Sequence, residues 1–216
     1  MIRLVVATGN AGKVREITRI LDGVCVEIVS LADFPSMPEP EETGSTFAEN
    51  AAIKARYAVQ HTGLPALADD SGLEVDALGG QPGIYSSRFA GPNATDKERY
   101  ELLLSLLADV PDDKRTARFK CAAALAFPSG ELQMFEGVCE GVICKEPHGA
   151  NGFGYDPVFF LPQYGLTMAE VGEDLKNEIS HRGKAMLAAR AALEALVSSI
   201  ERAPAELPPE AADGPE

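Results

Sequence analysis

Residues 2–29 read IRLVVATGNAGKVREITRILDGVCVEIV, and this stretch decides the fold class. The apolar runs 2–7 and 24–29 are each short enough for a buried strand. Between them apolar residues recur at the spacing of one helix face: Val14, Ile17, Ile20 and Leu21. Gly23 follows them and suits the C-cap of that helix. The order strand, helix, strand predicts an α/β fold.

Further helices are indicated by capping boxes, in which a Ser or Thr side chain and a Glu three residues later close the first turn. One box pairs Thr46 with Glu49, and the other pairs Thr95 with Glu98. A last helix is expected to begin near Ser180, where apolar residues again recur at helical spacing. The chain therefore alternates helices with strands over most of its length.

Three strands are expected between these helices. A short apolar run covers 66–68, alternating apolar residues cover 119–127, and 132–144 can pair back on them as a long hairpin. We expect one domain over 1–203. Residues 204–216 are rich in Pro, Ala and Glu and lack aromatic residues, which predicts a disordered tail.

The composition fits a folded protein whose charge excludes a role in coating nucleic acid. The chain has 216 residues, 45% of them hydrophobic, and a formal net charge of −14. Such a field repels a phosphate backbone, although a local basic pocket or a divalent cation can still hold a small polyanion. No apolar run is long enough to cross a membrane, and the opening run is too short for a signal peptide. We therefore expect a cytoplasmic protein that binds neither membranes nor nucleic acid.

The first candidate site is the loop Thr8-Gly9-Asn10-Ala11-Gly12-Lys13, between the first strand and the first helix. Asn10 can cap the helix, whose first-turn amides and dipole then favour an anion. Lys13 places a positive charge in that turn, which is unfavourable unless an anion compensates it. The loop is not a Walker A sequence, because Val14 stands where Ser or Thr is required. An ordinary strand-to-helix turn explains the spacing equally well.

The second candidate site is Asp69-Asp70-Ser71-Gly72, which follows the apolar run 66–68. Two carboxylates at a strand end repel each other unless something neutralises them. Magnesium held by carboxylates and substrate phosphates would do so. Glu41 and Glu42 are the nearest further oxygen ligands in the sequence. The alternatives are an acidic turn for the first group and a solvated charge pair for the second.

The third candidate site is the glycine-bearing loop 151–157, Asn-Gly-Phe-Gly-Tyr-Asp-Pro. An exposed aromatic side chain such as Phe153 or Tyr155 can stack on a base, worth roughly 1–3 kcal/mol. The loop lacks the third glycine of a dinucleotide-binding fingerprint. A turn closed by aromatic packing is the competing interpretation.

The fourth candidate site is the segment 176–184, Lys-Asn-Glu-Ile-Ser-His-Arg-Gly-Lys, at the start of the last predicted helix. Lys176, Arg182 and Lys184 gather there with His181, although the helix dipole disfavours cations at that end. An anionic or carbonyl-bearing ligand would explain the cluster. A solvated basic patch is the alternative.

Together these segments resemble the inosine triphosphate pyrophosphatase family, also called dITP/XTP pyrophosphatases. The resemblance runs from about Leu4 to Leu193. It includes, in order, ATGNAGKVREI, EETGSTFAENAAIKA, ADDSGLEVDALGGQPGIYSSRFAG, NGFGYDPVF and SHRGKAM. Each motif alone is weak, but the ordered set is specific. The resemblance implies an α/β fold with a long mixed β-sheet flanked by helices, two lobes around a deep active-site cleft, and a homodimer.

The same resemblance implies a reaction, the Mg²⁺-dependent hydrolysis of ITP, dITP and XTP to the monophosphate and pyrophosphate, which removes deaminated purines from the nucleotide pool. It implies Glu41 and Asp70 as metal ligands, with Asp70 also the proton acceptor for the attacking water and Asp69 beside it. The implied triphosphate-binding loop is Thr8, Gly9, Asn10, Ala11, Gly12 and Lys13, where Lys13 can stabilise the leaving pyrophosphate. The other implied substrate contacts are Ser71, Phe153, Gly154, Tyr155, Asp156, Lys176, His181 and Arg182.

Two other functions fit the same residues. A general phosphatase or nucleotidase would use the same metal carboxylates but would release orthophosphate. A non-catalytic nucleotide sensor would bind ITP without turnover. The adjacent Asp69 and Asp70 argue against a sensor, because a pure binder gains nothing from extra negative charge facing phosphates.

Overall fold

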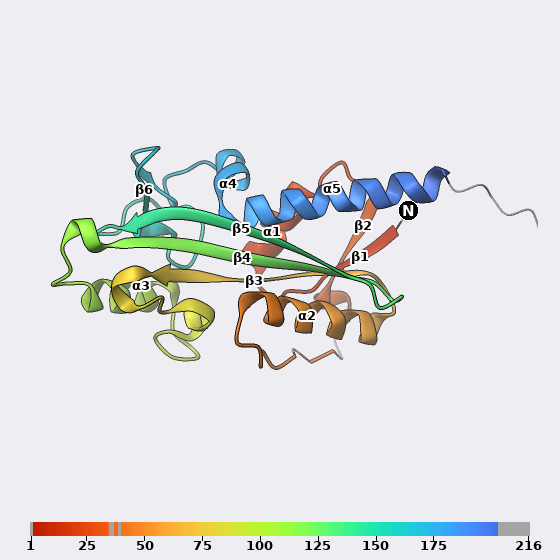
Figure 1. Cartoon of the computed structure of the whole chain (residues 1–216), viewed down its shortest axis with the longest axis horizontal. Coiled ribbons are helices and arrows are strands. Elements are labelled where there is room, and N and C mark those ends of the chain that lie inside the picture. The colour runs from red at the N-terminus through yellow and green to blue at the C-terminus, as the bar shows by residue number, and fades with distance from the viewer. Residues whose placement is uncertain (1, 35–36, 39, 203–216) are drawn as a thin grey trace, which may run out of the picture.

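A seven-stranded mixed sheet forms the middle layer of the protein (Figure 1), in a computed structural model that describes residues 2–34, 37–38 and 40–202. Across the sheet the strand order is β2-β1-β3-β4-β5-β6-β7. The strands are β1 Ile2–Val6, β2 Val26–Ser30, β3 Ala66–Val75, β4 Thr116–Ala126, β5 Leu132–Ile143, β6 Phe159–Leu161 and β7 Leu166–Thr167. β1 pairs in parallel with β2 and β3, and the remaining pairs are antiparallel. The predicted mixed sheet is therefore confirmed.

Helices cover both faces of this sheet. They are α1 Ala11–Ile20, α2 Phe47–Thr62, α3 Asp96–Leu106, α4 Glu173–Ile179 and α5 His181–Arg202. Short 3-10 turns span Leu31–Asp33, Asp76–Leu78, Gly83–Arg88, Asp112–Lys114 and Asp156–Val158. In Figure 1, α5 runs along one face of the sheet and α2 lies against the opposite face. The predicted α/β class with flanking helices is confirmed, whereas the division into two lobes stays a prediction.

The two faces of the sheet are packed with side chains of different size. On the α5 face, leucines and isoleucines of α1, β1 and β3 meet α5 in one core cluster. On the α2 face, the cluster consists almost wholly of alanines from α2, β3 and β4. Because alanine is short, α2 can approach the sheet closely. This approach brings the polar residues of α2 within reach of β3.

β3 is longer than the sequence predicted. The expected strand end at Asp69 and Asp70 is wrong, because β3 continues to Val75 and pairs with β4 residue by residue. The strand can continue past position 72 because Gly72 has no side chain. A Cβ there would lie only 2.5 Å from the carbonyl oxygen of Gly83. Asp69 and Asp70, which are typical turn residues, can therefore lie within a strand, because cations on both faces of the sheet form ion pairs with their side chains.

Of the two predicted capping boxes, one forms completely and the other forms in part. The box at Thr95 is complete. At Thr46 only half forms: the Thr46 hydroxyl accepts the amide of Glu49, while the Glu49 carboxylate instead accepts bonds from the amide and hydroxyl of Ser45. The expected last helix begins at His181, as predicted.

Two further expectations about helix ends are corrected. α1 ends at Ile20 with Leu21 as its C-cap, so Gly23 lies in the turn beyond the cap, with φ of 82°. Lys176 does not lie at the start of the last helix, because it belongs to the separate short helix α4. The predicted tail 204–216 lies outside the described residues, and the domain boundary at 203 stays a prediction.

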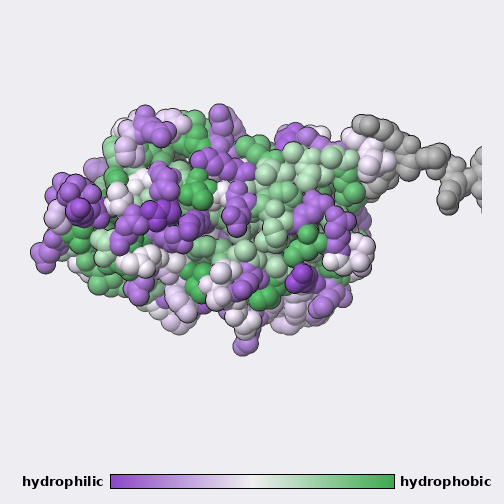
Figure 2. Space-filling model, in the orientation of Figure 1, coloured by the Kyte–Doolittle hydropathy of each residue, from purple (hydrophilic) through white to green (hydrophobic). Residues whose placement is uncertain are grey.

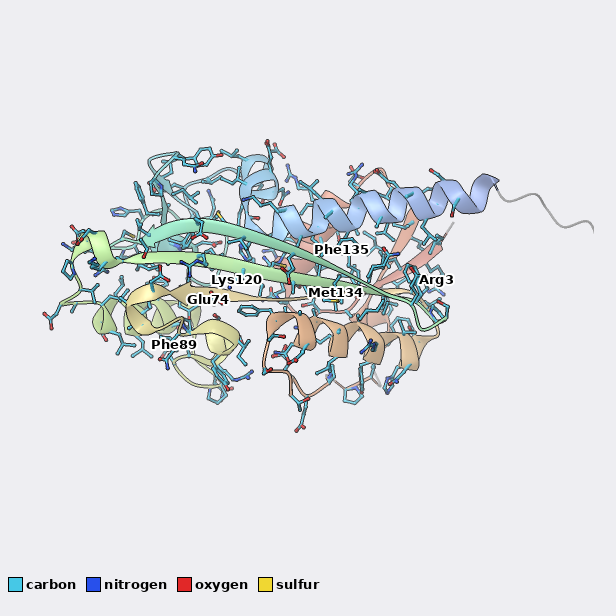
Figure 3. All side chains as sticks on the ribbon, in the orientation of Figure 1. Arg3, Glu74, Phe89, Lys120, Met134 and Phe135 are labelled. Carbon is cyan, nitrogen blue, oxygen red and sulfur yellow. The ribbon has the colours of Figure 1, made fainter. Side chains whose placement is uncertain are left out.

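Part of the sheet carries an ion-pair ladder rather than an apolar surface. Figure 3 shows Glu74 of β3 and Lys120 of β4 side by side, and their charged atoms are 2.9 Å apart. Arg118 continues the ladder to Asp76 and Glu140 at 2.9 and 3.2 Å. Figure 2 shows hydrophilic residues gathered over the left part of the visible face. Among the described residues, the helices are too short or too polar to cross a bilayer.

Candidate active site

A cavity of about 1010 Å³ gathers the candidate residues from distant parts of the chain. It lies where the start of α1, the middle of β3, the turn Gly83–Arg88, the 153–156 loop and the α4–α5 junction meet. Of the residues predicted from the sequence, the cavity is lined by Thr8, Gly9, Asn10, Ala11, Gly12, Lys13, Glu41, Asp70, Ser71, Phe153, Gly154, Tyr155, Asp156, Lys176, His181 and Arg182. Asp69 does not line it, and neither does Lys184, which is exposed and donates to the carbonyl oxygen of Val138. The four candidate segments thus form one site, large enough for a nucleotide-sized ligand.

The 8–13 loop is fixed by Asn10, as expected of a helix cap. The Asn10 side-chain oxygen accepts the amides of Gly12 and Lys13 at 2.8 and 3.2 Å, and the Thr8 hydroxyl accepts the amide of Asn10 at 3.2 Å. Two of the first-turn amides that we expected to be free are therefore bonded to Asn10. The loop enters the cavity as a pre-shaped element rather than as an open chain.

Asp69 neutralises two of the site's cations from behind the cavity wall. Its Oδ2 lies 2.9 Å from Lys13 Nζ and 3.2 Å from Arg182 Nε. Burial alone would raise the pKa of Asp69, but the charges of Lys13 and Arg182 outweigh burial and hold this pKa well below its ordinary value. The first-turn charge of Lys13 is therefore compensated inside the protein, and no bound anion is needed to explain it.

Asp70 points to the opposite face of the sheet, because successive side chains of a strand alternate. Its two oxygens lie 2.9 Å from Lys54 Nζ and 3.2 Å from Asn50 Nδ2, both on α2. Burial raises the pKa of Asp70; Lys54 opposes this rise and the neighbouring Glu42 adds to it. The neighbouring aspartates therefore form their direct ion pairs with different cations, and the expectation that magnesium binds here stays a prediction.

Carboxylates and an ammonium group lie together on the α2 side of the cavity. Lys54 Nζ is 2.9 Å from both Glu42 Oε1 and Asp70 Oδ1, and Glu41 lines the same wall. Among the described residues, no three His, Cys, Asp or Glu side chains are close enough to form a complete metal cage. Magnesium does not require one, since it is usually held by one or two carboxylates with waters and substrate phosphates. This oxygen donor set therefore fits Mg²⁺.

The far end of the cavity is built from a charge-balanced cluster. Glu16 of α1 lies 2.8 Å from Lys176 Nζ and 2.6 Å from Arg182 Nη1. Asp156 holds the same Lys176 at 2.7 Å, and Arg182 also donates to the Ser71 hydroxyl at 2.7 Å. Lys176 and Arg182 are therefore not a solvated patch, because buried carboxylates fix them in place, whereas Lys184 of the same segment is exposed.

Aromatic rings complete this end. The Phe153 ring centroid lies 5.0 Å from Lys176 Nζ and 5.4 Å from Arg182 Cζ. His181 stacks on Phe119 with centroids 4.6 Å apart. Burial holds the pKa of His181 well below its ordinary value, with the charge of Arg182 adding to the effect, so the imidazole is neutral at pH 7. Its Nδ1 is buried and has no hydrogen-bond partner among the described residues.

Several cavity residues escaped the sequence analysis. They are Lys54, Arg88, Asp96 and Arg99, with Glu16 of α1 and Asn50 of α2 supporting the wall from behind. One usable signal existed: Asn50 and Lys54 lie four residues apart, so they share a helix face, and that face adjoins the alanine stripe of α2. A polar pair beside a packed stripe indicates a buried polar contact. The remaining residues carry no comparable local signal.

Comparisons with known proteins show the family and the fold of this chain. A model of the Ham1 family matches residues 4–192. A dITP/XTP pyrophosphatase of Geobacter sulfurreducens is 55% identical over 86% of this chain and 94% of its own. One of Shigella flexneri is 51% identical over 86% and 95%. The solved structure of a HAM1 protein from Coxiella burnetii superposes with a TM-score of 0.82 at 46% identity, covering 89% of this chain and 98% of that one.

Proposed function

Because this chain belongs to the Ham1 family, we propose that it hydrolyses the triphosphates of deaminated purines, ITP, dITP and XTP, to the monophosphate and pyrophosphate. It is a nucleoside triphosphate pyrophosphohydrolase, which breaks the phosphoanhydride between the α and β phosphates. One observation carries the proposal: four sequence segments meet in one cavity that has carboxylates at one end and aromatic rings with fixed cations at the other. Relatives that carry the name dITP/XTP pyrophosphatase support it.

Asp70 is the proposed proton acceptor for the attacking water. Its buried carboxylate has a raised pKa, which makes it a stronger base than a solvated aspartate. Lys54 and Asn50 hold its two oxygens and so fix its direction. Asp69 is proposed to act indirectly, because its charge fixes Lys13 and Arg182 rather than facing the cavity.

The 8–13 loop is proposed to hold the phosphates, with Lys13 beside the leaving pyrophosphate. Thr8, Gly9 and Ala11 line the same wall of the cavity. The Asn10 cap keeps the loop in shape before substrate arrives, which lowers the ordering cost of binding. Gly12 leaves room for Phe153, since a Cβ there would lie 2.8 Å from the phenyl ring.

Mg²⁺ is the proposed cofactor, held by Glu41 and Asp70 with oxygens of the substrate. When bound, it offsets the negative charge that builds up on the phosphates during hydrolysis. Glu42 and Asp70 each lie 2.9 Å from Lys54, so Lys54 offsets part of the negative charge of the carboxylates on this side of the cavity.

Selection for the purine is proposed to occur at the aromatic end. Phe153 offers a stacking surface, Gly154, Tyr155 and Asp156 shape its loop, and the donors of Lys176 and Arg182 lie beside it. Hypoxanthine and xanthine carry a 6-oxo group, where adenine carries an amine. Donors that pair with this oxygen are left opposed by the amine, and such a site can discriminate by as much as ~10⁴-fold. Ser71 and the neutral His181 complete the contacts of this end.

We further propose a cytoplasmic homodimer that binds neither nucleic acid nor membranes. The homodimer rests on the family resemblance, and the lack of nucleic-acid binding rests on the net charge of −14. Light scattering behind a sizing column tests the assembly: a mass near one chain would contradict the dimer.

Product analysis tests the reaction. The protein is incubated with ITP, ATP or GTP, with and without Mg²⁺, and pyrophosphate and orthophosphate are assayed separately. We expect rapid, metal-dependent pyrophosphate release from ITP, with ATP and GTP nearly untouched. Orthophosphate from all three would replace this function with that of a general phosphatase, and binding of ITP without any product would indicate a sensor.

A further inference from the structure

The loop that carries Phe153 is held from two sides. Within the loop, the Phe153 amide donates to Asp156 Oδ2 at 2.9 Å, and that same carboxylate oxygen is 2.7 Å from Lys176 Nζ on α4. On the other side, the Gly154 amide donates to Asp96 Oδ2 at 2.7 Å. Gly154 and Asp96 are 58 residues apart in sequence, so this bond joins the loop to the first residue of α3.

Arg99 braces the second oxygen of Asp96. Its Nη1 lies 2.6 Å from Asp96 Oδ1, and its Nη2 donates to the carbonyl of Ala94 at 2.6 Å. The carboxylate is thereby fixed with one oxygen toward the loop and the other toward its own helix. Both Asp96 and Arg99 line the cavity, so this brace is part of the wall that substrate meets.

The position of Phe153 depends on the hydrogen bonds that hold its loop. Its ring lies against Gly12 of the phosphate loop and near the cations Lys176 and Arg182. Gly152 and Gly154, on either side of it, both have positive φ, at 75° and 65°. Glycine permits these angles but does not enforce them. The bonds at each end of the loop must therefore keep the ring in place.

We propose that Asp96 and Arg99 are positioning residues that hold Phe153 in the geometry needed to stack on the substrate base. The proposal rests on the proposed function, because it names Phe153 as the stacking surface. Neither residue touches the reacting phosphates in this scheme. Loss of the brace lets the loop move, so substrate binding bears the cost of reordering it. A mutation that weakens the binding of substrate and transition state equally raises KM and leaves kcat unchanged.

Steady-state kinetics on the full chain with ITP and Mg²⁺ separates this role from a structural one. For Asp96→Ala we expect KM to rise about tenfold with kcat within about twofold of wild type. Asp96→Asn retains an oxygen acceptor for the Gly154 amide and should recover part of the loss. The matched control is Glu98→Ala, which removes another carboxylate from the first turn of α3. The Glu98 carboxylate accepts hydrogen bonds from the amide and hydroxyl of Thr95 and not from the 151–157 loop.

The result that would overturn the proposal is an unchanged KM in folded Asp96→Ala, or an equal rise in Glu98→Ala, which would assign the effect to α3 as a whole. If Asp96→Ala does not fold, Arg99→Gln carries the test. It removes the guanidinium that holds Asp96 but leaves the bond between Asp96 and the Gly154 amide, so we expect a smaller rise in KM with kcat again within about twofold of wild type. An unchanged KM in Arg99→Gln would then reject the brace.

Amide hydrogen exchange gives a readout that does not depend on turnover. In the peptide covering 151–157, exchange should be at least about fivefold faster in Asp96→Ala than in wild type and Glu98→Ala, because opening of the loop becomes easier. Equal exchange in all three proteins would overturn the proposal. If wild type does not hydrolyse ITP, the proposed function fails on that result alone, and the exchange rates still decide whether Asp96 holds the loop.

Discussion

Two adjacent aspartates of β3 have different environments because a strand directs neighbouring side chains to opposite faces. Asp69 lies fully buried against Lys13 and Arg182, and Asp70 faces Lys54 and the cavity. Their pKa shifts have opposite directions, lowered for Asp69 by its cations and raised for Asp70 by burial. A permanently charged residue suits a fixed ion-pair network, whereas a carboxylate with a raised pKa suits proton transfer.

Asp70→Asn should abolish turnover. The amide keeps the size of the carboxylate and one of its two acceptor oxygens but cannot accept a proton from water, so we expect kcat for ITP to fall by about 10²–10⁴-fold. Pyrophosphate release in saturating ITP and Mg²⁺ measures this. The control is Glu74→Gln, on the same strand and the same face but paired with Lys120 outside the cavity. Near-normal kcat in Asp70→Asn would remove Asp70 from the proton-transfer role.

His181 should make the folded protein less stable in mild acid. Its folded-state pKa lies below the unfolded value of about 6.5, so the unfolded chain binds a proton that the folded protein excludes. The stability is therefore fully present above pH 6.5 and is lost as pH falls below it, by at most about 1.4 kcal/mol per pH unit. Urea unfolding at pH 7.5, 6.5 and 5.5 measures the slope.

His181→Phe keeps the stacked ring and removes the titrating group, so its slope over this pH range should be shallower than that of wild type. His148→Gln is the control, because His148 is exposed. Equal slopes in wild type and His181→Phe would show that His181 is not the group responsible.

Among the elements, the contact between α5 and β5 places the first residues of α5 in the site. Gly137 of β5 is the close point: a Cβ there would lie 2.0 Å from the carbonyl oxygen of His181 and 2.8 Å from the amide nitrogen of Ala185. Both are backbone atoms, which cannot move without shifting the helix. The absence of a side chain at one strand position therefore sets where His181 and Arg182 lie.

Gly137→Ala should destabilise the fold and disturb the site together. Overpacking of this kind costs about 1–3 kcal/mol, which urea unfolding at pH 7.5 detects as a lower midpoint. The neighbouring exposed position supplies the control, since Glu136→Ala adds no atom between strand and helix. A Gly137→Ala protein as stable as Glu136→Ala would mean that α5 can be displaced at little cost.

Local signals predicted the helix starts and most of the strands well, but they predicted the extent of β3 poorly. A cap needs only three or four neighbouring residues, and both Asn10 and the Thr95 box form as expected. The length of β3 depends instead on β4, whose pairing partners lie about fifty residues away. The residues Asp69 to Gly72 are turn formers by themselves, but pairing with β4 makes them a strand, and cations on both sides of the sheet satisfy the two aspartates.

At the scale of the whole molecule, the cavity is a product of long-range ion pairing. Arg182 is 166 residues from Glu16 and 113 from Asp69 in sequence, yet it bonds to both. The sequence motifs predicted which segments are involved, and each of these segments contributes residues to the cavity wall. Motifs could not reveal that buried carboxylates already neutralise the cations, because no sequence spacing connects residues so far apart.

Substrate should tie the two ends of this cavity together and thereby stabilise the entire fold. A ligand that binds only the folded state adds RT ln(1 + [L]/Kd), about 2.7 kcal/mol at a concentration of 100 Kd. For a protein of this size that corresponds to a rise in Tm on the order of 5–10 °C. The probe is an ITP analogue with a methylene bridge between the α and β phosphates, which cannot be hydrolysed there, in Mg²⁺ and measured by calorimetry.

Comparing the ITP analogue with IMP and with the equivalent ATP analogue tests whether both ends of the cavity contribute to binding. IMP lacks the pyrophosphate and reaches only the aromatic end and one phosphate position, whereas the equivalent ATP analogue keeps all the phosphates but presents an amine to Lys176 and Arg182. At equal concentration both should therefore raise Tm less than the ITP analogue does. If the ATP and ITP analogues stabilised the protein equally, the base would make no selective contact in the folded ground state. Discrimination would then have to arise during the chemical step, and the fixed cations beside Phe153 would not be its source.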